Sequence, residues 1–174
     1  MKFYSIILFT SLFLFISCQK DDETVENNSE FATALLKGTD SFVASKDNSE
    51  FTFLRATLHG NDLEIMARQD MPNNRFITIR ILLEEYAGPG TYYSGIDEDD
   101  LYNVSIGFGG EAGISYYSDY SKADFEGFRP GVFTITKDDG VLIEGTFSFI
   151  GFYNSTTSVD VTEGKFKMGF GNYP

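Results

Sequence analysis

The chain has few of the residues that carry metal or nucleophile chemistry. Its 174 residues include one cysteine, one histidine and no tryptophan. A single cysteine cannot form an internal disulfide, and one histidine with one cysteine falls short of the usual zinc ligand set. The histidine, His59, lies in the turn-like segment Leu58-His59-Gly60-Asn61, where we expect it to be exposed. We therefore predict neither a triad hydrolase nor a zinc enzyme, and we assign no catalytic residue.

Basic residues are also scarce. Thirteen lysines and arginines face 26 aspartates and glutamates, so the net charge is −13. Such a chain repels nucleic acid and anionic lipid head groups at long range. We exclude nucleic acid as a partner and expect any membrane attachment to come from a lipid.

The chain has no apolar run long enough to cross a membrane. The longest, from Ile6 to Ile16, is interrupted by Thr10 and Ser11, whereas a spanning helix needs about 20 apolar residues. Lys2 precedes the run and Ser17-Cys18 follows it directly. This is the layout of a secretory signal, which we place at residues 1–17.

The end of this signal carries a resemblance to a known class. Leu14-Phe15-Ile16-Ser17-Cys18 resembles the lipobox of bacterial lipoproteins, although Phe15 stands where leucine is usual. The resemblance implies that Cys18 becomes the lipidated N-terminus and anchors the protein to a membrane. Because Cys18 is the only cysteine, lipidation would also account for an unpaired thiol in an exported protein.

The residues after Cys18 carry a second resemblance. Lys20, Asp21 and Asp22, followed by Glu23, resemble the export signal of Bacteroidota surface lipoproteins, and the alternative is a solvated acidic tether. The resemblance implies an outer-membrane protein that faces the cell exterior. Residues 18–30 are too polar to form a core, so we predict a lipidated flexible tether there and a single β-domain over residues 31–174.

The dominant pattern of residues 31–174 has a period of two. In the segment 75–83, Ile77, Ile79, Ile81 and Leu83 alternate with polar residues, as in a half-buried strand. Similar runs are separated by turn residues, of which Asp139-Gly140 is the clearest hairpin signal. We predict an all-β fold with roughly eight to ten antiparallel strands and little or no helix, as a β-sandwich or a flattened β-barrel.

The last strands carry two more signals. Gly145 and Gly164 interrupt apolar runs and predict bulges or close backbone contacts. The segments 145–149 and 161–166 are similar to the C-terminal half of uncharacterised Bacteroidota lipoprotein domains, a similarity that implies no activity. A single helical turn is possible between Asp119 and Phe125.

Two clusters are candidates for binding. Asp97, Asp99 and Asp100 could offer oxygen ligands to calcium, but they lack the spacing and glycine of an EF-hand loop. Tyrosines crowd the middle of the chain, where they could form either core or a recognition surface. We assign a binding patch to the four tyrosines at expected strand ends and loops: Tyr92, Tyr93, Tyr117 and Tyr120.

These observations favour a non-catalytic surface lipoprotein. Its β-domain would bind a glycan or a protein, or act as a scaffold, at the outer membrane. A glycan hydrolase that uses two carboxylates is the second hypothesis, because such enzymes need no histidine. A carrier of a small apolar ligand inside a barrel is the third.

Overall fold

The computed structural model describes residues 29–36, 41–45, 51–96, 103–110 and 113–171. Eleven strands make up most of these residues. They are β1 (Phe31–Leu36), β2 (Ser41–Ser45), β3 (Phe51–His59), β4 (Asp62–Met71), β5 (Arg75–Leu83), β6 (Gly90–Ser94), β7 (Asn103–Gly109), β8 (Ile114–Ser118), β9 (Gly131–Asp138), β10 (Leu142–Asn154) and β11 (Thr157–Gly169).

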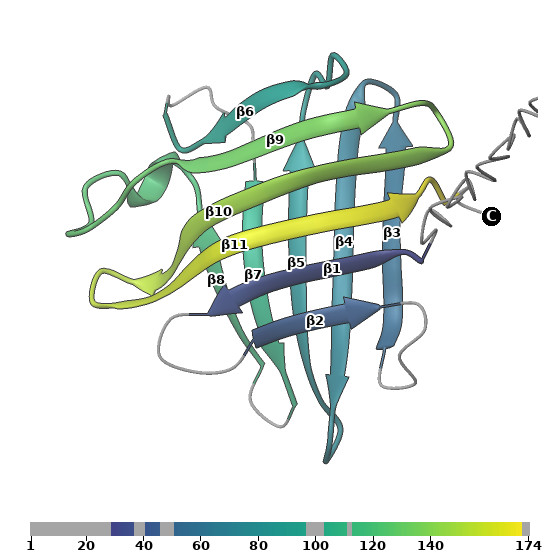
Figure 1. Ribbon diagram of the computed structural model, residues 1–174. Helices are drawn as coiled ribbons and strands as arrows, with labels where there is room; N and C mark the ends of the chain where they lie inside the picture. The colour runs from purple at the N-terminus through teal and green to yellow at the C-terminus, as the bar shows by residue number, and fades with distance from the viewer. Residues whose placement is uncertain (1–28, 37–40, 46–50, 97–102, 111–112, 172–174) are drawn as a thin grey trace, which may run out of the picture.

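The strands form two layers that cross at a steep angle (Figure 1). One layer has the order β6-β9-β10-β11-β1-β2 and the other β8-β7-β5-β4-β3, with antiparallel pairing throughout. We call them the β9–β11 layer and the β3–β5 layer. The only helical element in the described part of the chain is the 3₁₀ turn η1 (Tyr120–Lys122), which falls within the predicted segment.

The two layers are joined at two corners. At one, Phe152 on β10 pairs with Tyr117 on β8. At the other, Phe170, just after β11, forms a parallel bridge with Ala56 on β3, and the Gly171 N–H donates to the Ala56 carbonyl at 2.8 Å. The predicted antiparallel all-β fold is therefore confirmed, and of the two forms left open the structure is the flattened, nearly closed barrel.

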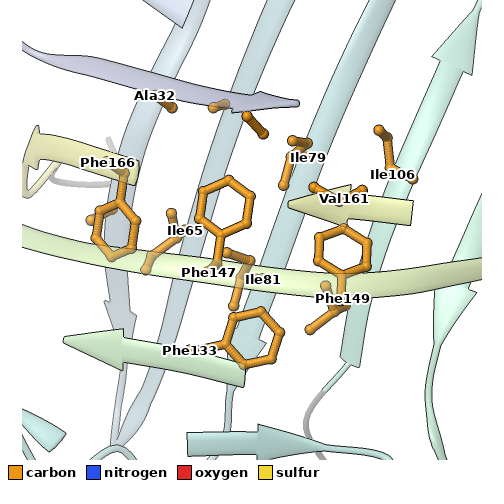
Figure 2. Packing of buried hydrophobic residues seen from close by; sticks show 14 of the residues in the cluster. Ala32, Ile65, Ile79, Ile81, Ile106, Phe133, Phe147, Phe149, Val161 and Phe166 are labelled. Carbon is orange, nitrogen blue, oxygen red and sulfur yellow. The ribbon is translucent and has the colours of Figure 1, made fainter. Parts of the chain in front are cut away.

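The interior between the layers is filled by apolar side chains. Alternation along the strands turns every second residue inward, and four phenylalanines pack in a row with neighbouring ring centroids 6.4 Å apart. Figure 2 shows these rings, from the β9–β11 layer, against isoleucines from the facing β3–β5 layer, together with Ala32 of β1, which belongs to the same layer as the rings. The labelled core residues are Ala32, Ile65, Ile79, Ile81, Ile106, Phe133, Phe147, Phe149, Val161 and Phe166.

Gly145 and Gly164 let two of these rings lie flat on the sheet. A Cβ at Gly145 would lie 2.4 Å from the Thr134 carbonyl oxygen and 2.7 Å from the ring of Phe166, its cross-strand partner. A Cβ at Gly164 would lie equally close to the carbonyl oxygen of its partner, Phe147. The predicted close contacts at both glycines are confirmed, and their physical reason is an aromatic ring covering the glycine across the strand pair.

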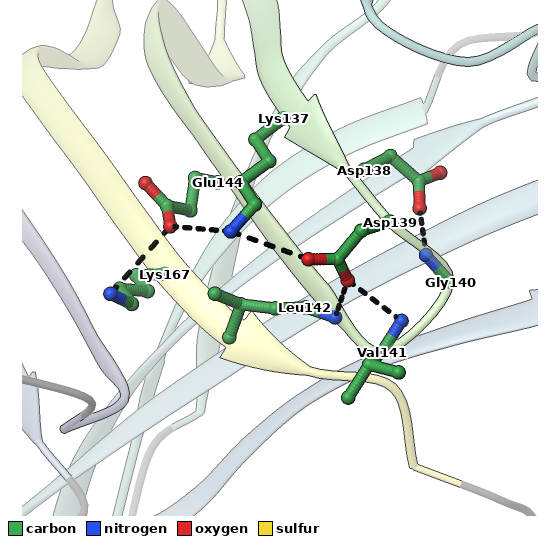
Figure 3. A network of polar contacts seen from close by, with 8 residues as sticks. All are labelled: Lys137, Asp138, Asp139, Gly140, Val141, Leu142, Glu144 and Lys167. Carbon is green, nitrogen blue, oxygen red and sulfur yellow. Dashed lines mark hydrogen bonds and ion pairs between the residues drawn. The ribbon is translucent and has the colours of Figure 1, made fainter. Parts of the chain in front are cut away.

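Two hairpin turns use the same hydrogen-bonding device. Between β9 and β10, the Asp139 carboxylate accepts hydrogen bonds from the N–H groups of Val141 and Leu142, at 3.0 and 2.8 Å (Figure 3). Between β10 and β11, the Asn154 side-chain oxygen accepts from the N–H groups at 156 and 157, at 3.0 and 2.8 Å. The predicted hairpin at Asp139-Gly140 is confirmed, and in both turns the Asx side chain hydrogen-bonds the backbone just ahead of it.

Candidate binding surface

Three of the four predicted tyrosines are exposed. Tyr93 on β6 and Tyr117 on β8 point away from the core and are 44% and 47% exposed, and Tyr120 in η1 is also exposed. Their neighbours Ser94 and Ser118 point inward and are fully buried, with their hydroxyl oxygens 3.5 Å apart. The segments that carry the three tyrosines therefore meet at one corner of the barrel.

The fourth tyrosine, Tyr92, differs from the expectation. Alternation on β6 turns its ring inward, where it is half-buried, packs against the core and lies 5.7 Å from the Tyr86 ring. Its hydroxyl donates to the Gly88 carbonyl at 2.6 Å and accepts from the Ala87 N–H at 3.2 Å. Tyr92 thus supports the loop before β6 instead of standing on the surface.

The same corner contains aromatic residues that sequence reasoning did not assign to it. Phe152, the partner of Tyr117, is buried beneath the rings of Phe125 and Phe128, with centroids 5.6 and 6.1 Å away. Tyr153 is 57% exposed. Phe152 is one of two adjacent buried residues in β10, and the Phe125 and Phe128 rings account for this break in the alternation. Because Phe152 lies far along the chain from the two rings that cover it, no local pattern predicted their contact.

A hollow of about 300 Å³ lies beside Tyr93 on the outside of the β9–β11 layer. Tyr93 pairs across the sheet with Val132, which lines the hollow. We call it the Arg129 hollow. Its lining residues are Arg129, Pro130, Val132, Ser148, Phe149, Asp160 and Thr162.

The polar centre of this hollow is one ion pair. The Arg129 Nη2 donates to both carboxylate oxygens of Asp160, at 2.9 Å each. The Arg129 side chain is 60% exposed and that of Asp160 is 19% exposed, so both groups are held in place and still reach solvent. Thirty-one residues separate them in the chain, and no local pattern predicted their contact.

A second hollow, of about 210 Å³, lies at the turn between β4 and β5. There the Arg68 guanidinium lies 3.8 Å above the Phe76 ring, and its Nε donates to Asp70 at 2.8 Å. The Phe76 ring also covers Gly109, its partner on β7. Arg68 is therefore engaged by a ring and a carboxylate, which makes this hollow a packed structural contact.

A third polar cluster lies on the outside of the β3–β5 layer. Glu64 on β4 has a side chain only 10% exposed and accepts a 2.6 Å hydrogen bond from Arg80 Nε. Arg55 Nη2 and His59 Nε2 lie 3.8 and 3.7 Å from its other oxygen. His59 is exposed, as predicted, but it ends β3 instead of lying within the turn. Three cationic or basic groups thus surround one carboxylate.

Several predicted sites lie outside the described residues: the lipidation residue Cys18, the export residues Lys20, Asp21 and Asp22, and the acidic residues Asp97, Asp99 and Asp100. Over the part of the chain that is described, no group of three or more histidine, cysteine or acidic side chains is arranged to hold a metal ion. None of the helical segments in that part has the length and apolar character needed to cross a membrane.

Comparisons with protein-family models, with curated proteins and with solved structures find no match to this chain.

Proposed function

We propose that this chain is a surface lipoprotein, anchored through Cys18, whose β-domain binds a ligand without catalysing a reaction. One observation carries the binding part of this proposal: exposed Tyr93 stands beside a hollow that contains a reachable ion pair. Exposed aromatic side chains next to polar groups that can still form hydrogen bonds are typical of recognition surfaces.

The packing of the barrel also supports an external site. A carrier of an apolar ligand needs space between the two layers, but the rings of Phe133, Phe147, Phe149 and Phe166 occupy the interior. A hydrolase needs two carboxylates facing a cleft. Each of the two hollows described on the barrel surface is lined by one acidic residue: Asp160 in the Arg129 hollow and Asp70, which binds Arg68, in the other. A binding surface on the outside accounts for these features best.

The anchor is tested by substitution of Cys18. In Cys18→Ala, radiolabelled lipid should no longer be incorporated and the protein should leave the membrane fraction. Replacing Lys20, Asp21 and Asp22 together with alanine should keep the lipid but protect the protein from protease added to intact cells. Normal labelling of Cys18→Ala would refute the anchor, and unchanged protease cleavage of the triple variant would refute the export signal.

The binding surface is tested with Tyr93→Ala, Tyr117→Ala and Tyr120→Ala. Each variant should keep the melting temperature of the native chain, because an exposed ring contributes little to packing, and should bind less to arrays of glycans and cell-surface proteins. Val141→Ala, which truncates an exposed apolar side chain on a hairpin turn distant in sequence from the corner, serves as the control. Equal binding by all four variants and the native chain would remove the tyrosines from the proposal.

A further inference from the structure

The Arg129 hollow has the features of a small-ligand site. Its volume of about 300 Å³ lies at the lower end of the range of about 300–1,000 Å³ for small-ligand sites. Its lining side chains come from three adjacent strands, β9, β10 and β11, and, for Arg129 and Pro130, from the loop just before β9. The inner side chains of these strands belong to the packed core. The sheet fixes the positions of Ser148, Asp160 and Thr162, and the ion pair with Asp160 holds the Arg129 side chain beside them, as a binding site requires.

The ion pair in the hollow leaves many hydrogen-bonding positions unused. A guanidinium has five N–H donors and a carboxylate has about four acceptor positions, whereas Arg129 uses only Nη2 to bind Asp160. In the described structure, no other hydrogen bond is made by either side chain. Arg129 Nε and Nη1 therefore keep donors, and Asp160 keeps acceptor positions, that no group of the described structure uses.

The arrangement of Arg129 and Asp160 suits a ligand that carries two adjacent hydroxyl groups. One hydroxyl can donate to an Asp160 oxygen while its neighbour accepts from an Arg129 N–H, because a hydroxyl is both donor and acceptor. The hydroxyls of Ser148 and Thr162, also in the hollow, extend the set of polar partners. The hollow thus suits a ligand with several hydroxyl groups.

The walls of the hollow suit the apolar side of the same ligand. Val132 lines it and Tyr93 stands directly across the strand pair, and both side chains are substantially exposed. A sugar ring presents C–H groups on one face and hydroxyls at its edge, and a tyrosine offers it a flat apolar surface with a polar tip.

Charge selects among such ligands. The charges of Arg129 and Asp160 cancel, so the pair itself favours neither an anion nor a cation. The net charge of −13 repels anionic ligands at long range. A neutral ligand is therefore favoured over a sulfated or carboxylated one.

We infer that the Arg129 hollow binds a neutral sugar unit, with two adjacent hydroxyls held by Asp160 and Arg129 and the ring against Tyr93 and Val132. This inference rests on the proposed binding function and names the ligand class for it. The site is small enough that it would hold one terminal unit of a glycan instead of a long chain.

The test is an array of neutral, sialylated, uronate-containing and sulfated glycans probed with the purified full chain. We expect binding to neutral glycans, and at least a tenfold loss in Arg129→Ala and Asp160→Asn with no change in melting temperature. Lys165→Ala removes an exposed charge from the same strand, β11, and should bind within twofold of the native chain.

Three outcomes would overturn the inference. The first is that the native chain binds only anionic glycans. The second is that Arg129→Ala binds as well as the native chain, and the third is that the native chain binds no glycan. In the third case a protein array separates the two proposals. A protein bound by the native chain but not by Tyr93→Ala would leave the proposed binding function standing, whereas no signal on either array would count against both.

Discussion

The two layers of the barrel each carry a guanidinium–carboxylate contact on the outside, and the two contacts differ in how completely they are satisfied. The Glu64 side chain on the β3–β5 layer is 10% exposed and accepts a hydrogen bond from Arg80, and Arg55 and His59 lie close to the same carboxylate. Asp160 on the β9–β11 layer accepts hydrogen bonds from a single nitrogen of Arg129, whose side chain is largely exposed. The first contact is closed around a buried charge, and the second is open to a ligand. The same chemistry can therefore stabilise a sheet or, as we propose for Arg129 and Asp160, contribute to a binding site, depending on burial and on unused donors.

The closed contact should give the largest effect on stability. Glu64→Ala leaves the Arg80 and Arg55 guanidinia without their shared carboxylate, and removing one partner of a buried pair costs about 3–5 kcal/mol. Because Arg80 is 40% exposed and can recover water, we expect a loss of about 2–3 kcal/mol in urea unfolding. Glu64→Gln keeps an acceptor for Arg80 and should lose less. If the midpoint of urea unfolding is the same for Glu64→Ala and the native chain, the cluster around Glu64 does not stabilise the fold.

A contact of intermediate burial should give a smaller effect. The half-buried Tyr86 hydroxyl donates to Asp138 at 2.8 Å, and burial, followed by this hydrogen bond, raises the pKa of Tyr86. Tyr86→Phe removes the donor and should cost about 1 kcal/mol at neutral pH.

The raised pKa of Tyr86 also predicts a dependence on alkaline pH. The stability that comes from its neutral form is complete below the unfolded pKa of about 10 and is lost as the pH rises through the folded value. The native chain should therefore lose more stability than Tyr86→Phe between pH 10 and pH 12, as measured by chemical denaturation at each pH. Parallel curves for the two proteins would contradict a protonated Tyr86 in the fold.

An exposed turn should give a still smaller effect, which depends on acidic pH. The backbone N–H groups of Leu142 and Val141, in that order, lower the pKa of Asp139. The stability from this carboxylate is present above its unfolded pKa of about 3.9 and is lost as the pH falls through the lower folded value. Asp139→Asn keeps the acceptor but does not titrate, so its stability should fall less steeply than that of the native chain between pH 4 and pH 2. The turn at Asn154 makes the same kind of hydrogen bonds with an uncharged side chain, so its contribution to stability should not change over this pH range.

The open contact should give the smallest effect on stability. Arg129→Ala removes an exposed ion pair, which contributes about 0–1 kcal/mol, and we expect a loss of less than about 0.5 kcal/mol in urea unfolding. Asp160→Asn should behave in the same way. A large loss of stability in either variant would make the Arg129 pair a structural contact and would remove the contrast between the two layers.

Sequence patterns predicted the fold where the signal is local. Alternation identified β5 through Ile77, Ile79 and Ile81, and the Asp139-Gly140 pair identified the turn between β9 and β10. These features depend on residues only a few positions apart, so periodicity and turn chemistry are sufficient to find them.

The corners and the hollow were not predictable in the same way. The Phe152–Tyr117 pair joins residues 35 positions apart, and the Arg129–Asp160 contact spans 31 positions. Their contact depends on how the layers close, which the period of a single strand does not specify. Tyr92 was misplaced for a different reason: the start of β6 at Gly90 sets which of two adjacent tyrosines turns inward, and a shift of one residue would exchange them.

The pairing of β1 with β11 has a consequence for the timing of folding. Residues 31–36 pair with β2 on one edge, but their partners on the other edge are residues 161–167. That edge of the first strand must therefore wait until nearly the whole domain has been made. Until then the edge of β1 that pairs with β11 in the native state keeps its backbone N–H and C=O groups without their partner strand. Closing so long a loop is slow compared with forming the hairpins between β3 and β5. The barrel therefore cannot close while the domain is still incomplete, and a chain truncated before β11 should remain open and prone to associate with other chains.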